Sequence, residues 1–191
     1  MKKIAELVKE AHQNAVNKGW WEEPRTYGEL IALVHSEVSE ALEDYRNGAD
    51  PHATWYEKKC GDEIKRSAEL VNDTWKPCGI PSELADICIR IFDIAGHCEL
   101  GRELQRTFET RYPLWVVTKQ SPFADNLAII HFNIADSFSA IGWKSKIGTL
   151  ADVLINTKSL AEFYGIDLER AIAEKMAYNA TRPQRHGGKV L

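Results

Sequence analysis

Apolar residues recur every three or four positions through most of the chain, and alternating patterns are scarce. This spacing is typical of amphipathic helices, and it predicts an all-α fold. We expect helices over about residues 2–18, 26–47, from 81 onward, 122–141, 147–164 and 167–181. Gly19 and Pro24 end the first helix, and Thr26 with Glu29 forms a capping box for the second.

Two segments interrupt the helical pattern. Residues 48–79 resemble an insertion, with a charged helical segment expected around Glu57–Leu70 and a breaker run at Lys76–Gly79. Residues 107–120 are expected to be irregular and broken at Pro113. Residues 183–191 form a basic, glycine-containing tail.

The chain also resembles itself. Three segments recur in order: 33–40 matches 129–136 at an offset of 96, 84–87 matches 150–153 at an offset of 66, and 103–106 matches 167–170 at an offset of 64. The drop from 96 to 66 equals the 30 extra residues of the insertion. We interpret this as a degenerate tandem duplication within a single domain of residues 1–191, with repeat one at about 1–112 and repeat two at about 121–182. The alternative is chance similarity between amphipathic helices.

Composition limits the classes of partner. The chain has no long uncharged apolar run, so we expect no membrane-spanning helix. A formal net charge of -4 argues against a broad nucleic-acid surface. None of the 4 cysteines forms a C-x-x-C pair, which favours reduced thiols in a cytoplasmic protein.

Two acidic pairs carry the candidate chemistry. Glu37 and Glu40 lie three residues apart in one predicted helix, and Glu83 and Asp86 lie three apart in the next. Residues three apart share a helix face, so two adjacent helices would bring four carboxylates together. Most such pairs are solvated, but apolar neighbours suggest partial burial here, and buried carboxylates need cations. All-oxygen ligand sets suit Mg²⁺ or Mn²⁺.

The two repeats differ at these positions. Glu37 aligns with Asn133 and Glu83 aligns with Thr149, so repeat two keeps only half of the carboxylates. Asp136 and Asp152 are interpreted as relics of a second site.

The end of repeat two carries a different set of polar residues. It ends in an uninterrupted Lys175…Asn179…Arg182 helix, whereas the matching stretch near Arg111 is cut short by Pro113. This difference predicts one composite site, with metal ligands from repeat one and phosphate contacts from repeat two.

Both acidic motifs, together with Lys175–Arg182 and the following Arg185–Lys189, resemble the all-α nucleoside triphosphate pyrophosphohydrolases, which include MazG-like and dimeric dUTPase-like proteins. The resemblance implies a helical bundle of MazG-like type. It also implies that the four acidic residues bind Mg²⁺ and that Lys175 and Asn179, with Tyr178 adjacent, contact the nucleotide. The spacing from Glu40 to Glu83 is longer than the family pattern.

The implied reaction is Mg²⁺-dependent hydrolysis of a (d)NTP to a (d)NMP and pyrophosphate, as in dUTP- or dCTP-type house-cleaning. Glu37 or Glu40, or a metal-bound hydroxide poised by one of them, would activate the attacking water. Lys175 and Arg182 would offset phosphate charge, and the tail with Arg185 and Lys189 would close over the triphosphate.

The preferred base stays open. Trp20 and Trp21 are candidates for a base-stacking wall, with core packing as the alternative.

The residues bear on three other function classes. A non-catalytic metal or nucleotide-binding regulator on the same fold remains an alternative. An HD-type phosphohydrolase needs a His-Asp dipeptide, and a di-iron bundle needs E-x-x-H repeats; the chain has neither. For assembly, a self-sufficient monomer and a homodimer both remain open.

Overall fold

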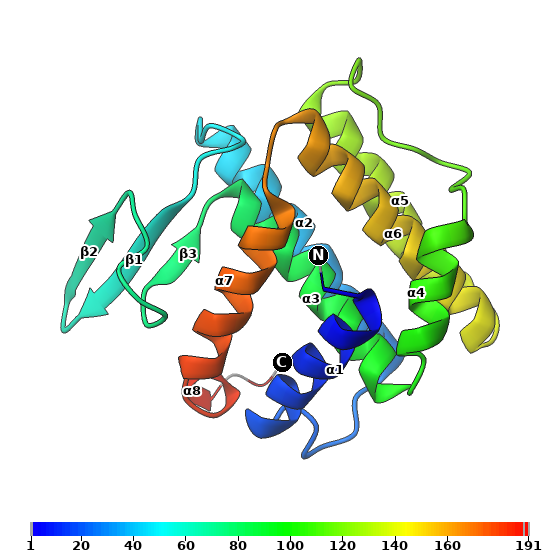
Figure 1. Ribbon diagram of the computed structural model, residues 1–191, viewed down its shortest axis with the longest axis horizontal. Helices are drawn as coiled ribbons and strands as arrows, with labels where there is room; N and C mark the ends of the chain where they lie inside the picture. The colour runs from blue at the N-terminus through cyan, green and yellow to red at the C-terminus, as the bar shows by residue number, and fades with distance from the viewer. Residues whose placement is uncertain (1, 189, 191) are drawn as a thin grey trace.

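The computed structural model describes residues 2–188 and 190, and they form a mostly helical protein with a small three-stranded sheet (Figure 1). In chain order the elements are α1 (Ile4–Asn17), α2 (Tyr27–Arg46), β1 (Trp55–Cys60), β2 (Glu63–Ser67), β3 (Lys76–Cys78), α3 (Ile80–His97), α4 (Gly101–Thr110), α5 (Phe123–Ser139), α6 (Trp143–Phe163), α7 (Leu168–Thr181) and α8 (Arg185–Gly188). The predicted helices are therefore present, and the all-α expectation is wrong only in the insertion.

Helix boundaries follow the local signals in the sequence. The Glu29 N–H donates to Thr26 Oγ1 at 3.2 Å, and the Thr26 N–H donates to Glu29 Oε2 at 2.7 Å, which confirms the capping box that begins α2. Pro81 lies in the first turn of α3, where its missing N–H costs no hydrogen bond. These caps fix where the two acidic helices begin, and hence how their faces meet.

The insertion corrects one prediction. The charged helix expected around Glu57–Leu70 is absent, and β1 and β2 form an antiparallel hairpin that projects from the helices (Figure 1). Cys60 pairs with Glu63 across a two-residue turn, and Gly61 in that turn has a φ of 65°. Such a turn favours glycine and closes a tight hairpin. The buried Tyr56 anchors the hairpin to α7, because its hydroxyl donates to Glu174 Oε2 at 2.7 Å.

The segment expected to be irregular begins later than predicted. Helix α4 continues to Thr110, and the irregular stretch starts at Arg111. Side-chain amides hold this stretch in place: the Val117 N–H donates to Asn156 Oδ1 at 2.9 Å, and Asn126 Nδ2 donates to the Thr118 carbonyl at 2.9 Å.

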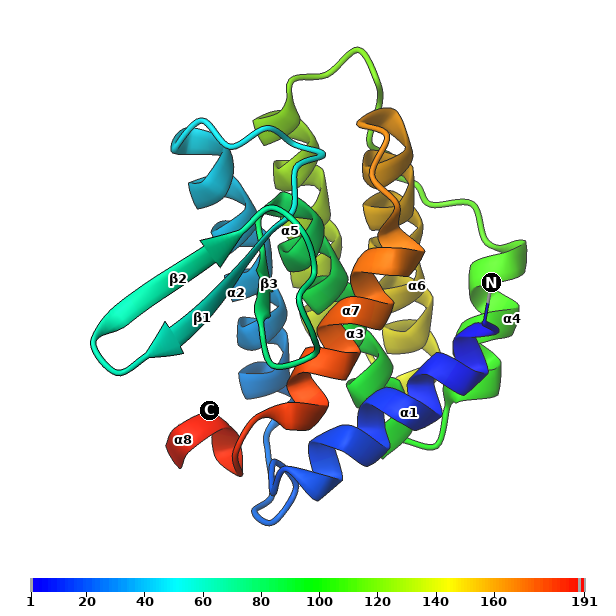
Figure 2. The same cartoon turned by 60° about the vertical axis from the view of Figure 1, so that its left-hand side comes forward.

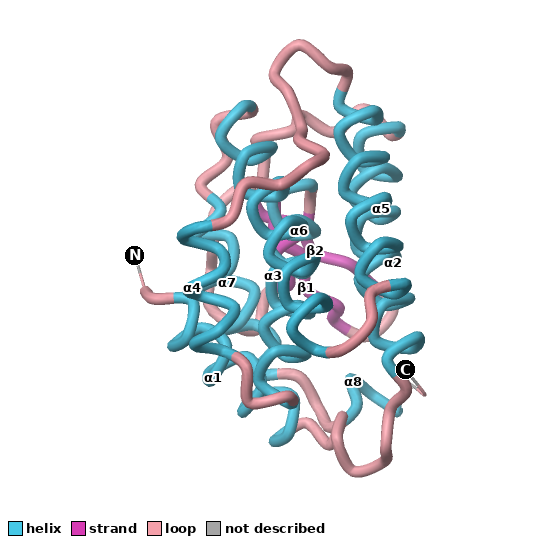
Figure 3. Tube along the Cα trace, turned by 90° about the vertical axis from the view of Figure 1, so that its right-hand side faces the viewer, coloured by secondary structure: helices cyan, strands magenta, loops and turns pink. Residues whose placement is uncertain are grey.

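The helices form three layers (Figure 3): α2 with α5, α3 with α6, and α1 with α4 and α7. Helix α3 lies at the centre, and its apolar side chains are almost completely buried. Helix α7 runs between the sheet and α1 (Figure 2). In the described part of the chain, no helix combines the length and apolar character that a membrane crossing needs.

The contacts between the first and the second group of helices are exchanged in the same way on both sides. Helix α7 packs on α3, and α4 packs on α6, while α2 contacts α5 and α3 contacts α6. At the α2–α5 contact, His35 Nδ1 lies 2.8 Å from His131 Nδ1, so one ring donates and the other accepts. These two histidines are the pair aligned by the offset of 96 in the sequence.

Candidate functional site

Three of the four predicted carboxylates come together between α2 and α3. Glu37, Glu83 and Asp86 each place an oxygen within 4.8 Å of the others. Glu37 and Glu83 are only 5% exposed, because apolar residues of both helices surround them. Glu40 lies one turn further along α2, is exposed and is not part of this group. The group of Glu37, Glu83 and Asp86 is called the carboxylate cluster below.

Two cations of the chain itself contact the carboxylate cluster. Lys175 Nζ lies 2.7 Å from Asp86 Oδ2 and donates to Ser82 Oγ at 2.7 Å. Arg90 Nε donates to Glu37 Oε1 at 3.0 Å. The cluster therefore holds three acidic groups against two basic ones.

Burial changes how these groups titrate. Desolvation, with a further contribution from Asp86, raises the pKa of Glu37 to about 7. Desolvation also raises the pKa of Glu83 to about 8, although Lys175 opposes the change. Burial alone would lower the pKa of Lys175, but attraction to Asp86 and Glu83 outweighs it and raises that pKa, so the amine stays charged. The cluster is short of positive charge, which is the condition that a divalent cation relieves.

A small cavity of about 70 Å³ lies beside the cluster, between α1, α3 and α7. We call it the Asp86 cavity; its lining includes Trp20, Asp86, Arg90, Asn179 and Arg182. Asn179 is nine-tenths buried, and its Oδ1 has no hydrogen-bond partner among the described residues. Buried polar atoms in folded proteins are almost always paired, so this amide oxygen points to a ligand that binds in the cavity.

The predicted contacts on α7 lie where the helical spacing places them. Lys175, Asn179 and Arg182 share one face, toward α3 and the carboxylate cluster. The Arg182 guanidinium lies 5.7 Å from the centre of the Tyr178 ring. Tyr178 itself is not among the residues that line the Asp86 cavity.

The two tryptophans are placed differently. Trp20 lines the Asp86 cavity and also a second cavity of about 20 Å³, which we call the Trp21 cavity. Trp21 stacks on His97 with ring centres 3.8 Å apart, and its Nε1 donates to Asp93 Oδ1 at 2.9 Å. Trp20 therefore borders the cavity that Asp86 lines, while Trp21 packs on His97 and bonds to Asp93.

In its described part, the tail contacts the turn after α1 and makes no contact with the carboxylate cluster. The Arg185 N–H donates to the Lys18 carbonyl at 2.8 Å, and its guanidinium lies 3.5 Å from Glu22 and 3.4 Å from Glu23. Arg185 thus covers the turn that carries Trp20. Lys189 lies outside the described residues.

Sequence reasoning missed two residues of the site, Arg90 and Ser82. Arg90 lies four residues after Asp86 and seven after Glu83, which puts it on the same face of α3. That spacing was the available signal. Ser82 gave no signal, because its role depends on the approach of Lys175 from α7.

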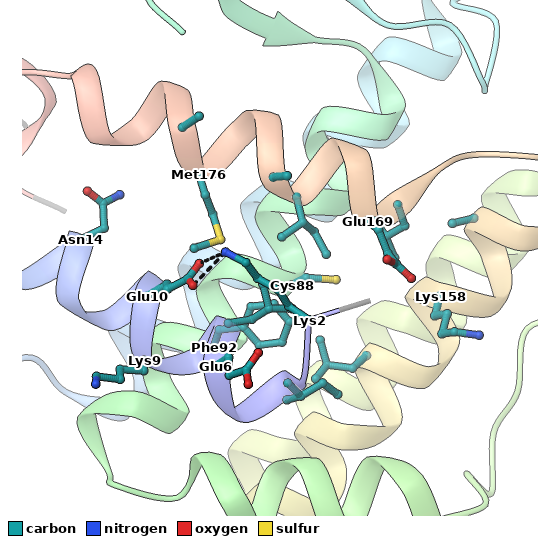
Figure 4. Close-up of a pocket in the computed structure, with 18 of the residues that line it drawn as sticks. Lys2, Glu6, Lys9, Glu10, Asn14, Cys88, Phe92, Lys158, Glu169 and Met176 are labelled. Atoms are coloured by element: carbon teal, nitrogen blue, oxygen red, sulfur yellow. Dashed lines mark hydrogen bonds and ion pairs between the residues drawn. The ribbon is translucent and has the colours of Figure 1, made fainter.

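The largest cavity described is a separate apolar cleft of about 1110 Å³ between α1, α3, α6 and α7 (Figure 4). Phe92 and Met176 line it, and Lys2 pairs with Glu10 at its rim at 2.7 Å. None of the three cluster carboxylates faces this cleft. Its lining is largely apolar, and two pairs of its charged residues, Lys2 with Glu10 and Lys158 with Glu162, form ion pairs.

The positions that the sequence alignment pairs with the carboxylate cluster carry no charge deficit. The Arg111 guanidinium donates two hydrogen bonds to the Asp152 carboxylate, at 2.6 and 2.7 Å. Asn133 and Thr149 bond to carbonyls of their own helices at 2.9 Å. Asp136 is exposed. One carboxylate here faces one guanidinium.

Comparisons of the chain with protein-family models, with curated proteins and with solved structures find no match. Function is therefore inferred from the side chains of the site. An acidic cluster short of positive charge suits a divalent cation, and the adjoining arginines suit an anion. The unpartnered Asn179 oxygen is an acceptor and suits a hydrogen-bond donor of a ligand or a cation. A metal-bound phosphate ligand combines both.

Proposed function

We propose that the protein is a Mg²⁺-dependent nucleoside triphosphate pyrophosphohydrolase. The observation that carries this proposal is the Asp86 cavity, where buried carboxylates short of positive charge adjoin Arg90, Arg182 and the unpartnered Asn179 oxygen. Glu37, Glu83 and Asp86 would hold the cation, with Glu40 reaching in from the exposed edge. Mn²⁺ would satisfy the same oxygen ligands.

In the proposed reaction, water attacks the α-phosphorus, the bond from that phosphorus to the α–β bridging oxygen breaks, and pyrophosphate leaves. A bound Mg²⁺ would supply Lewis-acid stabilisation of the phosphate oxygens. Glu37 or Glu40 would accept the proton of the attacking water. Arg182 would neutralise charge on the phosphates, and Lys175 would hold Asp86 in place.

Substrate entry requires the site to open. A pocket of about 70 Å³ is much smaller than the roughly 300 Å³ or more of typical ligand sites. The turn after α1 borders the cavity through Trp20, and Arg185 and Gln184 hold that turn through Lys18 and Glu22. Release of these exposed contacts is the simplest route for a nucleotide to reach the carboxylates.

The proposal includes a duplicated helical unit. The exchange of α4 and α7 between the repeats and the contact of His35 with His131 are what a duplication around a pseudo-two-fold axis predicts. The ion pairs Lys175–Asp86 and Arg111–Asp152 also match, at offsets of 64 and 66. The composite site then draws its metal ligands from repeat one and Lys175 and Asn179 from repeat two.

A regulator that binds Mg²⁺-nucleotide without cleaving it is the second candidate. It is favoured by the positions of the two proposed bases, because Glu37 already accepts hydrogen bonds from Arg90 and Glu40 lies outside the carboxylate cluster, so neither is set to take a proton from water. Both candidates share the same ligand, so only turnover separates them.

The deciding experiment is a pyrophosphate-release panel over the common ribo- and deoxyribonucleoside triphosphates, with Mg²⁺ and with EDTA. We expect release from at least one triphosphate, loss of that release in EDTA, and slower turnover in Glu40→Gln. Binding of Mg²⁺-nucleotide without release would favour the regulator. Neither binding nor release would reject both.

A further inference from the structure

The two cations at the carboxylate cluster are held in different ways. Lys175 is 4% exposed and is fixed at two points, by Asp86 and by Ser82. Arg90 is 32% exposed and contacts a single oxygen, Glu37 Oε1, through Nε and Nη2 at 3.0 Å each. A buried cation with two anchors stays in place, whereas a partly exposed one with a single acceptor exchanges more easily.

Arg90 also has open space beside it. It lines both the Asp86 cavity and the Trp21 cavity, and Trp20 and Asp93 border the same two spaces. Asp93 does not compete for the guanidinium through Oδ1, since that oxygen already accepts from His12 and Trp21 at 2.7 and 2.9 Å. Because Arg90 already lines both cavities, a guanidinium that left Glu37 would still border them.

We infer that Arg90 is a phosphate-binding residue whose availability is controlled by the metal. In the cation-free protein it neutralises Glu37, and a divalent cation at Glu37 displaces it into the Asp86 cavity. There it binds a phosphate group through two parallel N–H donors.

The physical basis is competition for one oxygen. A divalent cation bound by Glu37 Oε1 takes the acceptor of Arg90 and repels the guanidinium. Desolvating an unpaired guanidinium is costly, so it needs a new anion within reach. Its planar fork matches a phosphate group better than an ammonium does.

This exchange of Arg90 links the binding of the metal to the binding of phosphate. Metal binding frees the residue that binds phosphate, and phosphate binding holds that residue away from the metal ligand. The affinities for the two ligands must then rise together and by the same factor. This inference rests on the proposed function for the identity of the anion, and the exchange of Arg90 itself does not depend on turnover.

The test compares Arg90→Gln and Arg90→Lys with the wild-type protein in two calorimetric titrations. The first uses Mg²⁺ alone. We expect Arg90→Gln to bind Mg²⁺ roughly five- to tenfold more tightly, because the competing cation is gone. The second uses inorganic triphosphate in saturating Mg²⁺. Here we expect Arg90→Gln to bind roughly tenfold more weakly, with Arg90→Lys between it and the wild type.

Arg106→Gln is the matched control, since it removes one positive charge from an exposed pair with Glu103. It should change neither titration, and urea unfolding checks that each variant is folded. A structural role for Arg90 predicts weaker binding of both probes in Arg90→Gln. That result, or equal affinities in variant and wild type, overturns the inference.

The outcomes separate this inference from the proposed function. Pyrophosphate release that is absent in the wild type, with both affinities shifted as expected, rejects the enzyme and keeps the Arg90 exchange. If the wild type releases pyrophosphate but the affinities of the variants are unshifted, the enzyme is kept and the Arg90 exchange is rejected. A wild-type protein that binds no Mg²⁺ in the first titration rejects both.

Discussion

The carboxylate cluster on α2 and α3 and the aligned positions on α5 and α6 carry different charges. At the cluster, three carboxylates face two cations beside a cavity; at the aligned positions, one carboxylate faces one guanidinium. The matching residues are Glu37 with Asn133, Glu83 with Thr149, Asp86 with Asp152, and Lys175 with Arg111. The fold is therefore compatible with either arrangement, and the charge balance decides which half is suited to a metal ion.

The residue beside each basic side chain has a size that suits that side chain. Lys175 donates to Ser82, and the position equivalent to Ser82 is Gly148. A Cβ atom on Gly148 would lie 3.1 Å from Arg111 Nη1. The missing side chain thus makes room for the larger guanidinium.

The largest expected effect comes from removing the two basic residues. Lys175→Met leaves buried carboxylates without their amine and should reduce the free energy of unfolding by about 3–5 kcal/mol. Arg111→Met should cost clearly less, because Arg111 is 39% exposed and water can replace part of its contact with Asp152. Urea unfolding in EDTA measures both. An equal loss in the two variants would show that the two halves are electrostatically equivalent.

The next effect concerns turnover. Glu83→Gln keeps the shape of the side chain but removes one charge from the cluster, and we expect pyrophosphate release to fall by about 10²-fold or more. Thr149→Ala is the matched change in repeat two and should leave the rate within about twofold, since Thr149 bonds only to its own helix. A similar loss in Thr149→Ala would place chemistry in both halves.

The raised pKa values of Glu37 (about 7) and Glu83 (about 8) predict a stability that depends on pH. Groups whose pKa is higher in the folded than in the unfolded state stabilise the fold at low pH, and that contribution is lost as pH rises through the folded value. Cation-free protein should therefore lose on the order of 3 kcal/mol for each of the two groups between about pH 5 and pH 8.5.

Thermal unfolding in EDTA across this range measures the loss, and Glu83→Gln should flatten the curve. Mg²⁺ should raise the melting temperature more at pH 8.5 than at pH 6, because the carboxylates are then ionised. A wild-type curve that is flat in EDTA would contradict the titration of the buried carboxylates.

The sequence was most informative where a single helix decides the outcome. The capping residues at Thr26 and Glu29 and the i, i+3 spacing of Glu83 and Asp86 act locally, so they predicted helix starts and a shared face. Three of the four carboxylates converge because α2 and α3, which are consecutive helices, pack side by side. Glu40 is the exception, since it lies one turn beyond Glu37, is exposed to solvent and is not part of the cluster.

The predictions that failed concerned features that depend on short turns or on contacts between residues distant in sequence. The hairpin of the insertion was hidden by its charged residues, and only the Gly61-Asp62 turn marked it. The counterpart of Arg90 in repeat two is Asn156, which instead holds the irregular segment through Val117. Nothing in the local sequence distinguishes these two roles, because each depends on what packs opposite.

The smallest expected effect tests the fit of Gly148 against Arg111. Gly148→Ser gains about 0.5 kcal/mol of helix propensity but crowds Arg111 Nη1, so the single change should be close to neutral. Arg111→Lys gives the same pairing as Ser82 with Lys175, and adding Gly148→Ser to it should then stabilise the protein. A double-mutant cycle in urea should show a favourable coupling of about 0.5–1 kcal/mol. Additive effects would mean that the hydroxyl and the amine do not meet in repeat two, and the two halves would then match in helix packing without matching in the local geometry of their ion pairs.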